Sequence, residues 1–173
     1  MHLADLGERI CILGPSNSGK STLAEAIARK RNLKAIHLDQ LYHLPNTDWE
    51  PRPTEEFLAL HDKMIAGDRW IMEGNYSSCL PQRLVRATGV IVLDISTMTS
   101  LFRYMRRTLF ERHRVGALEG RKDSLKWDMI RYIVVTTPGN RYRQIELYRQ
   151  IGLPKIRLRS VREINEQHRE WDL

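Results

Sequence analysis

Short apolar runs alternate along this chain with longer segments in which apolar residues recur every three or four positions. Each short run predicts a buried strand, and the five runs cover 10–14, 34–39, 69–74, 89–95 and 154–160. The longer segments predict helices over 22–31, 54–65, 99–113, 124–135 and 161–171. Because strands and helices alternate, we expect an α/β fold whose parallel sheet is covered by helices on both faces. Such sheets bind ligands at the carboxyl ends of their strands.

The composition is that of one globular domain over residues 1–173, with 42% hydrophobic and 28% charged residues. We find no apolar run of about 20 residues and no signal-peptide pattern, so we expect a cytoplasmic protein without a membrane partner. Cys11 and Cys79 are too few for a disulfide framework, and neither is given a function. The net charge of +7 favours an anionic partner, either nucleic acid or a polyphosphate substrate.

The segment GPSNSGKST follows the first predicted strand and precedes the first predicted helix. It matches the P-loop pattern G-x-x-x-x-G-K-[ST] at Gly14, Gly19, Lys20 and Ser21. Backbone N–H groups and a helix N-terminus bind phosphate in this motif, the lysine contacts the β- and γ-phosphates, and the hydroxyl binds Mg²⁺. We therefore predict an ATP and Mg²⁺ site. Its nucleotide-binding residues are Gly14, Pro15, Ser16, Asn17, Ser18, Gly19, Lys20, Ser21 and Thr22.

Three acidic residues close predicted strands. A P-loop enzyme needs an acid near the magnesium ion, and Glu73 is our candidate, with Asp94 as the competitor. Asp39 ends the second predicted strand and is our candidate for holding or deprotonating the phosphate acceptor; a helix N-cap is the alternative. The flanking histidines His37 and His43 are left out of the predicted site.

The proline-rich segment 42–53 is a candidate wall of an acceptor site, and its Trp49 is equally consistent with an anchor to the core. Arg52, Arg83 and Arg86 are weaker candidates for pairing with an anionic acceptor.

The helix predicted over 99–113 combines an apolar stripe with a basic face. Arg103, Arg106 and Arg107 recur at i, i+3 and i+4 and share the basic face. Arginines on a closing segment stabilise the charge of a transferring phosphoryl group, which favours a catalytic lid after the fourth strand. A solvated basic face and a nucleic-acid surface are the alternatives. We expect the apolar stripe to be buried; it consists of Leu101, Phe102, Met105, Leu109 and Phe110.

Taken as an ordered set, the segments GPSNSGKST, HLDQLY, WIMEGNYSSCLPQRL, IVLDIS and RYMRRTLFERHR resemble the nucleoside-monophosphate-kinase-like branch of P-loop NTPases. The chain is most similar to small bacterial adenylate-kinase-like proteins labelled DNA topology modulation proteins. The resemblance implies a three-layer fold with a five-stranded parallel sheet in the order 2-3-1-4-5. It also implies an acceptor-binding segment at about 40–68 and a helical lid at about 103–127.

The resemblance assigns roles to several residues. It puts Glu73 where the family's acid helps to organise Mg²⁺, Arg103 and Arg107 on the lid helix, and Arg159 near the nucleotide base. Adenylate kinases carry G-F-P-R after the acid, where this chain has Gly74-Asn75-Tyr76. That departure weighs against a nucleoside monophosphate as acceptor.

The leading hypothesis is a kinase that transfers the γ-phosphate of ATP to a small acceptor. Its predicted catalytic residues are Lys20, Asp39, Glu73, Arg103 and Arg107, and its predicted metal ligands are Ser21 and Glu73. The alternative hypothesis is a nucleotide-dependent regulatory or nucleic-acid-associated ATPase that hydrolyses ATP slowly. We do not favour nucleic acid as a partner. The identity of the acceptor and the oligomeric state are open at this point.

Overall fold

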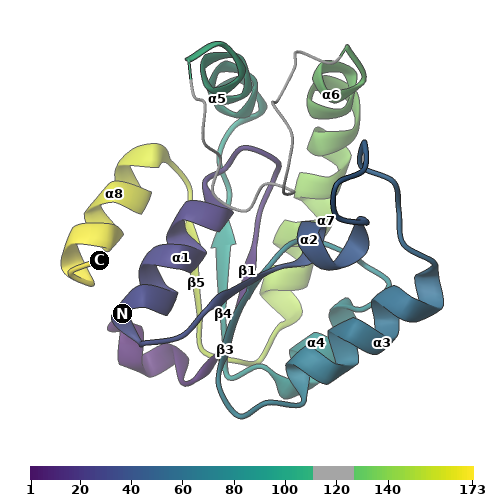
Figure 1. The fold of residues 1–173 in the computed structure, drawn as a ribbon. Coiled ribbons are helices and arrows are strands. Elements are labelled where there is room, and N and C mark those ends of the chain that lie inside the picture. The colour runs from purple at the N-terminus through teal and green to yellow at the C-terminus, as the bar shows by residue number, and fades with distance from the viewer. Residues whose placement is uncertain (111–126) are drawn as a thin grey trace.

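The computed structural model describes residues 1–110 and 127–173 (Figure 1). Within its helices it leaves out the side chains of Arg107, Phe110, Asp128, Met129, Tyr132, Thr137 and Pro138. Five parallel strands form one sheet in the order β2-β3-β1-β4-β5. The strands are β1 (Arg9–Leu13), β2 (Ala35–His37), β3 (Trp70–Glu73), β4 (Gly89–Leu93) and β5 (Lys155–Leu158). The α/β fold and the predicted strand order are thus confirmed.

Helices cover both faces of this sheet, as predicted (Figure 1). The 3₁₀-helix η1 (Leu3–Leu6) precedes the sheet, and the π-helical segment η2 (Tyr132–Thr136) connects two later helices. The α-helices are α1 (Lys20–Lys30), α2 (Leu38–Tyr42), α3 (Thr54–Ile65), α4 (Leu80–Arg86), α5 (Thr97–Phe110), α6 (Trp127–Arg131), α7 (Thr137–Gln150) and α8 (Val161–Glu170). No helix among the described residues has the length and apolar character needed to cross a membrane.

Two hydrophobic cores lie on opposite faces of the sheet. On one face, Leu23 and Ile27 of α1 and Ile164 of α8 pack against β1 and β4. On the other, Phe57 of α3 packs with Cys11 and Val90 of the same strands, and α4 and α7 add partly buried residues. Each central strand is therefore buried on both sides, which explains why its sequence is an uninterrupted apolar run.

The sequence-based boundaries need three corrections. The second strand ends at His37, and Asp39 lies in the first turn of α2 rather than at the end of a strand. Within the range predicted as a helix, 124–135, the structure describes α6 from Trp127 onward. This helix continues through η2 into α7, and α7 was not predicted from the sequence. Helix α4 was also missed, because a seven-residue segment is too short to establish a helical period.

The stripe predicted to be buried on α5 is largely exposed. Phe102 is 63% exposed, Met105 37% and Leu109 65%, whereas Ser100 and Tyr104 are buried. Leu101 is half-buried, and the side chain of Phe110 lies outside the described residues. The prediction was wrong because α5 projects beyond the carboxyl end of the sheet, where the sheet no longer covers its apolar residues (Figure 1).

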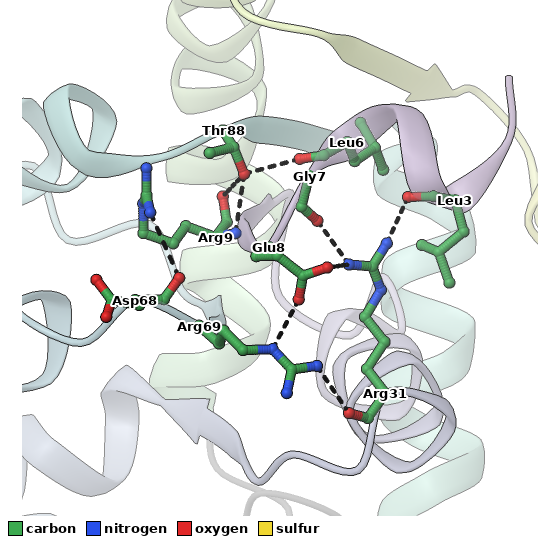
Figure 2. A network of polar contacts seen from close by, with 9 residues as sticks. All are labelled: Leu3, Leu6, Gly7, Glu8, Arg9, Arg31, Asp68, Arg69 and Thr88. Atoms are coloured by element: carbon green, nitrogen blue, oxygen red, sulfur yellow. Dashed lines mark hydrogen bonds and ion pairs between the residues drawn. The ribbon is translucent and has the colours of Figure 1, made fainter.

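A polar network closes the amino edge of the sheet, where β1, β3 and β4 begin (Figure 2). Arg31, which follows α1, donates to Leu3 O and Gly7 O, both at 2.7 Å, and to Glu8 Oε1 at 3.0 Å. Arg69 Nε donates to the other Glu8 oxygen at 2.8 Å. Each of these donors bonds to an acceptor of the chain itself, so these contacts stabilise the fold at this edge.

Candidate active site

The P-loop lies between β1 and α1, at the carboxyl edge of the sheet. Its backbone adopts positive φ at Gly14 (151°), Asn17 (62°) and Gly19 (96°), and α1 then begins at Lys20. A Cβ atom at Gly14 would lie 2.6 Å from Leu93 O, so only glycine fits there. The loop thus curls tightly in front of a helix N-terminus, the arrangement that binds phosphate.

Two polar atoms of the P-loop are buried without a partner. Asn17 Oδ1 and Ser18 Oγ have no hydrogen-bond partner among the described residues. Asn75, just after β3, supports the loop from below: its Nδ2 donates to Gly14 O at 2.7 Å, and its Oδ1 accepts from Gly14 N at 3.1 Å. In the part of the chain that the structure describes, buried polar atoms without a partner also occur outside the P-loop, at His61 Nε2, Trp70 Nε1 and Ser100 Oγ, so this feature alone does not mark the loop as a ligand site.

Lys20, Ser21 and Glu73 meet beside this loop. Lys20 Nζ donates to Pro15 O at 3.0 Å, which holds the ammonium group on the P-loop. Ser21 Oγ donates to Glu73 Oε1 at 2.9 Å, which brings together the two predicted metal ligands. Thr22, also predicted to bind nucleotide, is exposed in the first turn of α1. The structure therefore gathers the hydroxyl, the carboxylate and the ammonium of the predicted site.

A buried histidine holds Glu73 in place. His37 Nδ1 lies 2.9 Å from Glu73 Oε1, and His37 Nε2 lies 3.0 Å from Glu25 Oε1. Burial alone would lower the pKa of His37, but the hydrogen bonds to both carboxylates raise it above its ordinary value of 6.5. Burial alone would raise the pKa of Glu73, but His37, Lys20 and Ser21 lower it below 4.5. The contacts with His37 and Ser21 therefore favour the ionised form of Glu73, and the raised pKa of His37 favours its protonated form.

Asp94, the competing acid, has other partners. It is 2% exposed and bonds Arg141 of α7 and Arg157 of β5, with Arg157 Nε at 2.9 Å from Asp94 Oδ2. Burial would raise the pKa of Asp94, but these two guanidinium groups lower it below its ordinary value of 3.8. Its charge is already balanced by two arginines, so the geometry favours Glu73 over Asp94 as the acid beside the P-loop.

Asp39 lies at the same edge of the sheet, in the first turn of α2. Its Oδ1 accepts a 2.8 Å hydrogen bond from the Tyr76 hydroxyl, after β3. Burial and the nearby Asp39 carboxylate raise the pKa of Tyr76 far above its ordinary value of 10, so the phenol stays protonated and donates. The side chains of Asp39 and Tyr76 are both half-buried and retain contact with solvent.

Aromatic rings surround this pair. The Tyr42 and Tyr76 ring centroids are 4.8 Å apart, and Tyr42 also contacts Phe57 edge-on at 5.2 Å. Trp49 stands edge-on against His43 at 5.1 Å and adopts φ of 62°, which is rare for a bulky residue. Strained backbone of this kind is typical of loops that shape a ligand site.

The predicted lid arginines are placed unequally. Arg103 of α5 reaches the P-loop: a Cβ atom on Gly19 would lie 3.2 Å from Arg103 Nη2. The side chain of Arg107 and residues 111–126 of the predicted lid lie outside the described residues. Arg159 is exposed after β5, and its backbone N–H donates to Glu163 Oε2 at 2.7 Å. The structure thus brings Arg103, but not Arg159, into contact with the P-loop.

Two positions that contact the predicted site were missed by the sequence analysis. His37 was left out, although its place at the end of an apolar strand beside Asp39 was a usable signal. Asn75 could not be found, because its contacts depend on how the turn after β3 folds back. The sequence analysis named Arg83 only as a weaker candidate for pairing with an anionic acceptor. Arg83 is fully buried, and its Nη2 donates to Gly74 O at 2.9 Å.

The fold is that of P-loop kinases. A gluconokinase from Sinorhizobium meliloti 1021 is similar with a TM-score of 0.58 and 17% identity, over 96% of this chain and 90% of that chain. A shikimate kinase from Bacteroides thetaiotaomicron is similar with a TM-score of 0.53 and 16% identity, over 96% of this chain and 99% of that chain. No protein-family model and no curated protein sequence matches this chain. Neither structure is named for DNA topology or as an adenylate kinase, so that finer resemblance gains no support from them.

Proposed function

We propose that this protein is a kinase that transfers the γ-phosphate of ATP to a hydroxyl group of a small molecule. The observation that carries the proposal is the contact between Ser21 and Glu73 at the end of the P-loop, with Asp39 on the neighbouring strand connection. These groups match the parts that phosphoryl transfer requires: a phosphate cradle, an acid for the metal and a group for the acceptor. The gluconokinase and the shikimate kinase have the same fold, which supports the class but not the substrate.

The P-loop residues bind and orient the triphosphate in this proposal. The backbone of residues 14–21 and the N-terminus of α1 hold the phosphates, and Lys20 places its positive charge on the β- and γ-phosphates. Arg103 adds a second charge from α5, because its guanidinium already lies against Gly19. We retain Arg107 and the lid at about 103–127 as part of the proposal, and Arg159 as a weaker candidate near the base.

The oxygen atoms at this site fit a magnesium ion. The Ser21 hydroxyl and the Glu73 carboxylate are hard oxygen ligands that lie 2.9 Å apart. Among the described residues no three His, Cys, Asp or Glu side chains gather to hold a metal. In this proposal, phosphate oxygens and water complete the coordination of the Mg²⁺ ion. When bound, the ion would neutralise charge on the β- and γ-phosphates.

Asp39 holds the acceptor in this proposal. Its carboxylate accepts the proton of the acceptor hydroxyl, and Tyr76 fixes its orientation through the 2.8 Å hydrogen bond. The segment at about 40–68 supplies the remaining acceptor contacts through Tyr42 and Trp49. Since positioning and charge neutralisation account for most of the catalysis of phosphoryl transfer, these residues are a nearly sufficient set in this proposal.

The test is ADP formation from Mg·ATP with a panel of small hydroxylated compounds, with Lys20→Ala as the control. We expect one acceptor class to stimulate ADP formation in the wild type, and Lys20→Ala to lower that rate by roughly 10²–10³-fold. Because Lys20 donates its hydrogen bond to a loop carbonyl, Pro15 O, the variant should fold normally. Lys20-dependent hydrolysis that no acceptor stimulates would instead favour the regulatory ATPase.

A further inference from the structure

Four consecutive residues at the end of β3 contact different parts of the candidate site. We call residues 73–76 the connecting turn. At its start, Glu73 accepts a 2.9 Å hydrogen bond from Ser21 of α1. At its end, Tyr76 donates a 2.8 Å hydrogen bond to Asp39 of α2. The connecting turn therefore extends from the predicted metal ligands to the predicted acceptor residue.

Asn75 joins the connecting turn to the P-loop. The pairing of β1 with β3 sets Ile12 opposite Glu73, so the same register sets Gly14 opposite Asn75. Asn75 Nδ2 donates to Gly14 O at 2.7 Å, and Asn75 Oδ1 accepts from Gly14 N at 3.1 Å. The side-chain amide thus presents a donor and an acceptor to Gly14, as the backbone of a paired strand would. The position of the first P-loop glycine and that of the connecting turn are therefore fixed together.

Gly74 packs the same turn tightly against α2. It adopts φ of 130°, and a Cβ atom there would lie 2.9 Å from the Cβ atom of Leu38. Leu38 is fully buried and directly precedes Asp39. On the other side, Arg83 Nη2 donates to Gly74 O at 2.9 Å. Because protein interiors are close-packed, a turn held in this way orders α2 when it is itself ordered.

We infer that Asn75 is a positioning residue that couples the nucleotide to the acceptor side of the site. A phosphate bound in the P-loop orders Gly14, and Asn75 and Tyr76 transmit that order to Asp39. This inference rests on the nucleotide site of the proposed function. Binding that orders one element lowers the entropic cost of ordering an element joined to it, so no change of shape is required. By thermodynamic reciprocity, an acceptor held at Asp39 strengthens nucleotide binding by the same factor.

The test is amide hydrogen exchange with and without saturating Mg·ADP, which requires no acceptor. The amides of His43 and Leu44 are hydrogen-bonded in the folded chain, so exchange in 38–44 reports the order of α2 and the residues after it. In the wild type, Mg·ADP should slow exchange in the P-loop, and also in 38–44 by roughly fivefold or more, the lower end of usual coupling energies. Exchange in α8 corrects for the general stabilisation that any bound ligand gives.

Asn75→Ala removes the link between the P-loop and the connecting turn. At saturating Mg·ADP the P-loop should still be protected, whereas the ligand-dependent protection of 38–44 should be lost. Because rates with and without Mg·ADP are compared in the same variant, a general loss of stability does not imitate this result. Ser78→Ala, an exposed change after the turn, is the matched control and should behave like the wild type. Equal protection of 38–44 in the wild type and Asn75→Ala would overturn the inference.

Tyr76→Phe tests the other end of the turn and does not depend on the folding of Asn75→Ala. It removes the hydroxyl that donates to Asp39 and keeps the ring, so the P-loop should stay protected while 38–44 loses most of its protection. Unchanged protection of 38–44 would contradict the coupling through this turn.

The inference and the proposed function can fail separately. Coupled protection in a protein that transfers phosphate to no acceptor would support the inference and contradict the kinase. Transfer to an acceptor, with Mg·ADP protecting the P-loop but not 38–44, would support the kinase and overturn the inference. Failure of Mg·ADP to protect the P-loop of the wild type would contradict both.

Discussion

The two edges of the sheet are built on opposite principles. At the amino edge, Arg31 and Arg69 place their donors on carbonyls and on the Glu8 carboxylate of the chain itself (Figure 2). At the carboxyl edge, the P-loop has positive φ angles at Gly14, Asn17 and Gly19, and Asn17 and Ser18 carry buried polar atoms without partners among the described residues. Arg31 and Arg69 of the amino edge bond to acceptors of the chain itself, whereas the carboxyl edge carries the predicted phosphate-binding loop. We therefore predict that changes at the amino edge alter stability and that changes at the carboxyl edge alter binding.

The carboxylates at the two edges of the sheet also have different kinds of partners. The Glu8 carboxylate is shared between two arginines at the amino edge, a purely structural arrangement. At the carboxyl edge, Glu73 is shared between Ser21 and His37, so one of its partners is a predicted metal ligand. The comparison teaches that a carboxylate at a strand end is informative only when its partners are known, as the arginine-paired Asp94 also illustrates.

The largest expected effect is at the carboxyl edge. Glu73→Gln should lower Mg-dependent ADP formation by roughly 10–100-fold, the usual loss when a metal-organising group is removed. Glu25→Gln is the matched control, because Glu25 contacts the same histidine but not Ser21 in the hydrogen bonds shown. It should reduce the rate only a few-fold. Equal losses in the two variants, measured by steady-state kinetics, would contradict the prediction that Glu73 organises the metal.

A change at the amino edge should do the reverse. Arg31→Ala deletes hydrogen bonds to Leu3 O, Gly7 O and Glu8, and should lower the free energy of unfolding by about 2–3 kcal/mol. The activity per folded molecule should stay unchanged. Arg29→Ala, an exposed change in the last turn of α1, should cost less than about 0.5 kcal/mol. Urea unfolding checks both values, and a loss of activity without a loss of stability in Arg31→Ala would break the comparison.

The smallest expected effect is a pH dependence of stability. The raised pKa of His37 stabilises the folded state below pH 6.5, and this contribution is lost as the pH rises through the folded pKa. The lowered pKa of Glu73 stabilises above pH 4.5, and this contribution is lost as the pH falls through the folded pKa. The pair therefore contributes most between about pH 4.5 and 6.5, by roughly 1.5–3 kcal/mol for its charged hydrogen bond. His37→Gln should flatten that part of the profile in urea titrations; an identical profile would contradict the charged pair.

The fold was predictable because its central strands are buried on both faces. Runs such as 10–14 and 89–93 are apolar throughout, and the helix over 54–65 was placed at the bounds that the structure gives. The prediction that failed was the burial of the apolar stripe on α5, which extends beyond the sheet. Phe102 and Leu109 look like core residues by spacing, but no sheet lies beneath them.

Helix α7 was missed for the opposite reason. It is mostly polar, and only residues near its end, such as Leu147 and Tyr148, pack against the core. A helix with so little apolar surface has no periodicity to detect, and its place depends on contacts such as that between Arg141 and Asp94.

The site was predictable where a motif dictates backbone geometry. Gly14, Gly19, Lys20 and Ser21 follow from the P-loop pattern, and the structure places Glu73 beside them. The supporting contacts were not predictable, because His37 and Asn75 act through partners that only folding brings near. The assignment of catalytic roles remains a prediction.

The most direct test of the central claim, that the carboxyl edge is a nucleotide site, is equilibrium binding of Mg·ADP to the wild type and to Lys20→Ala. The account predicts one site per chain in the wild type and at least about tenfold weaker binding in the variant, since charge-assisted hydrogen bonds to phosphate are among the strongest in proteins. Arg29→Ala should bind like the wild type. Equal affinity of the wild type and Lys20→Ala, or no binding by either, would contradict the claim.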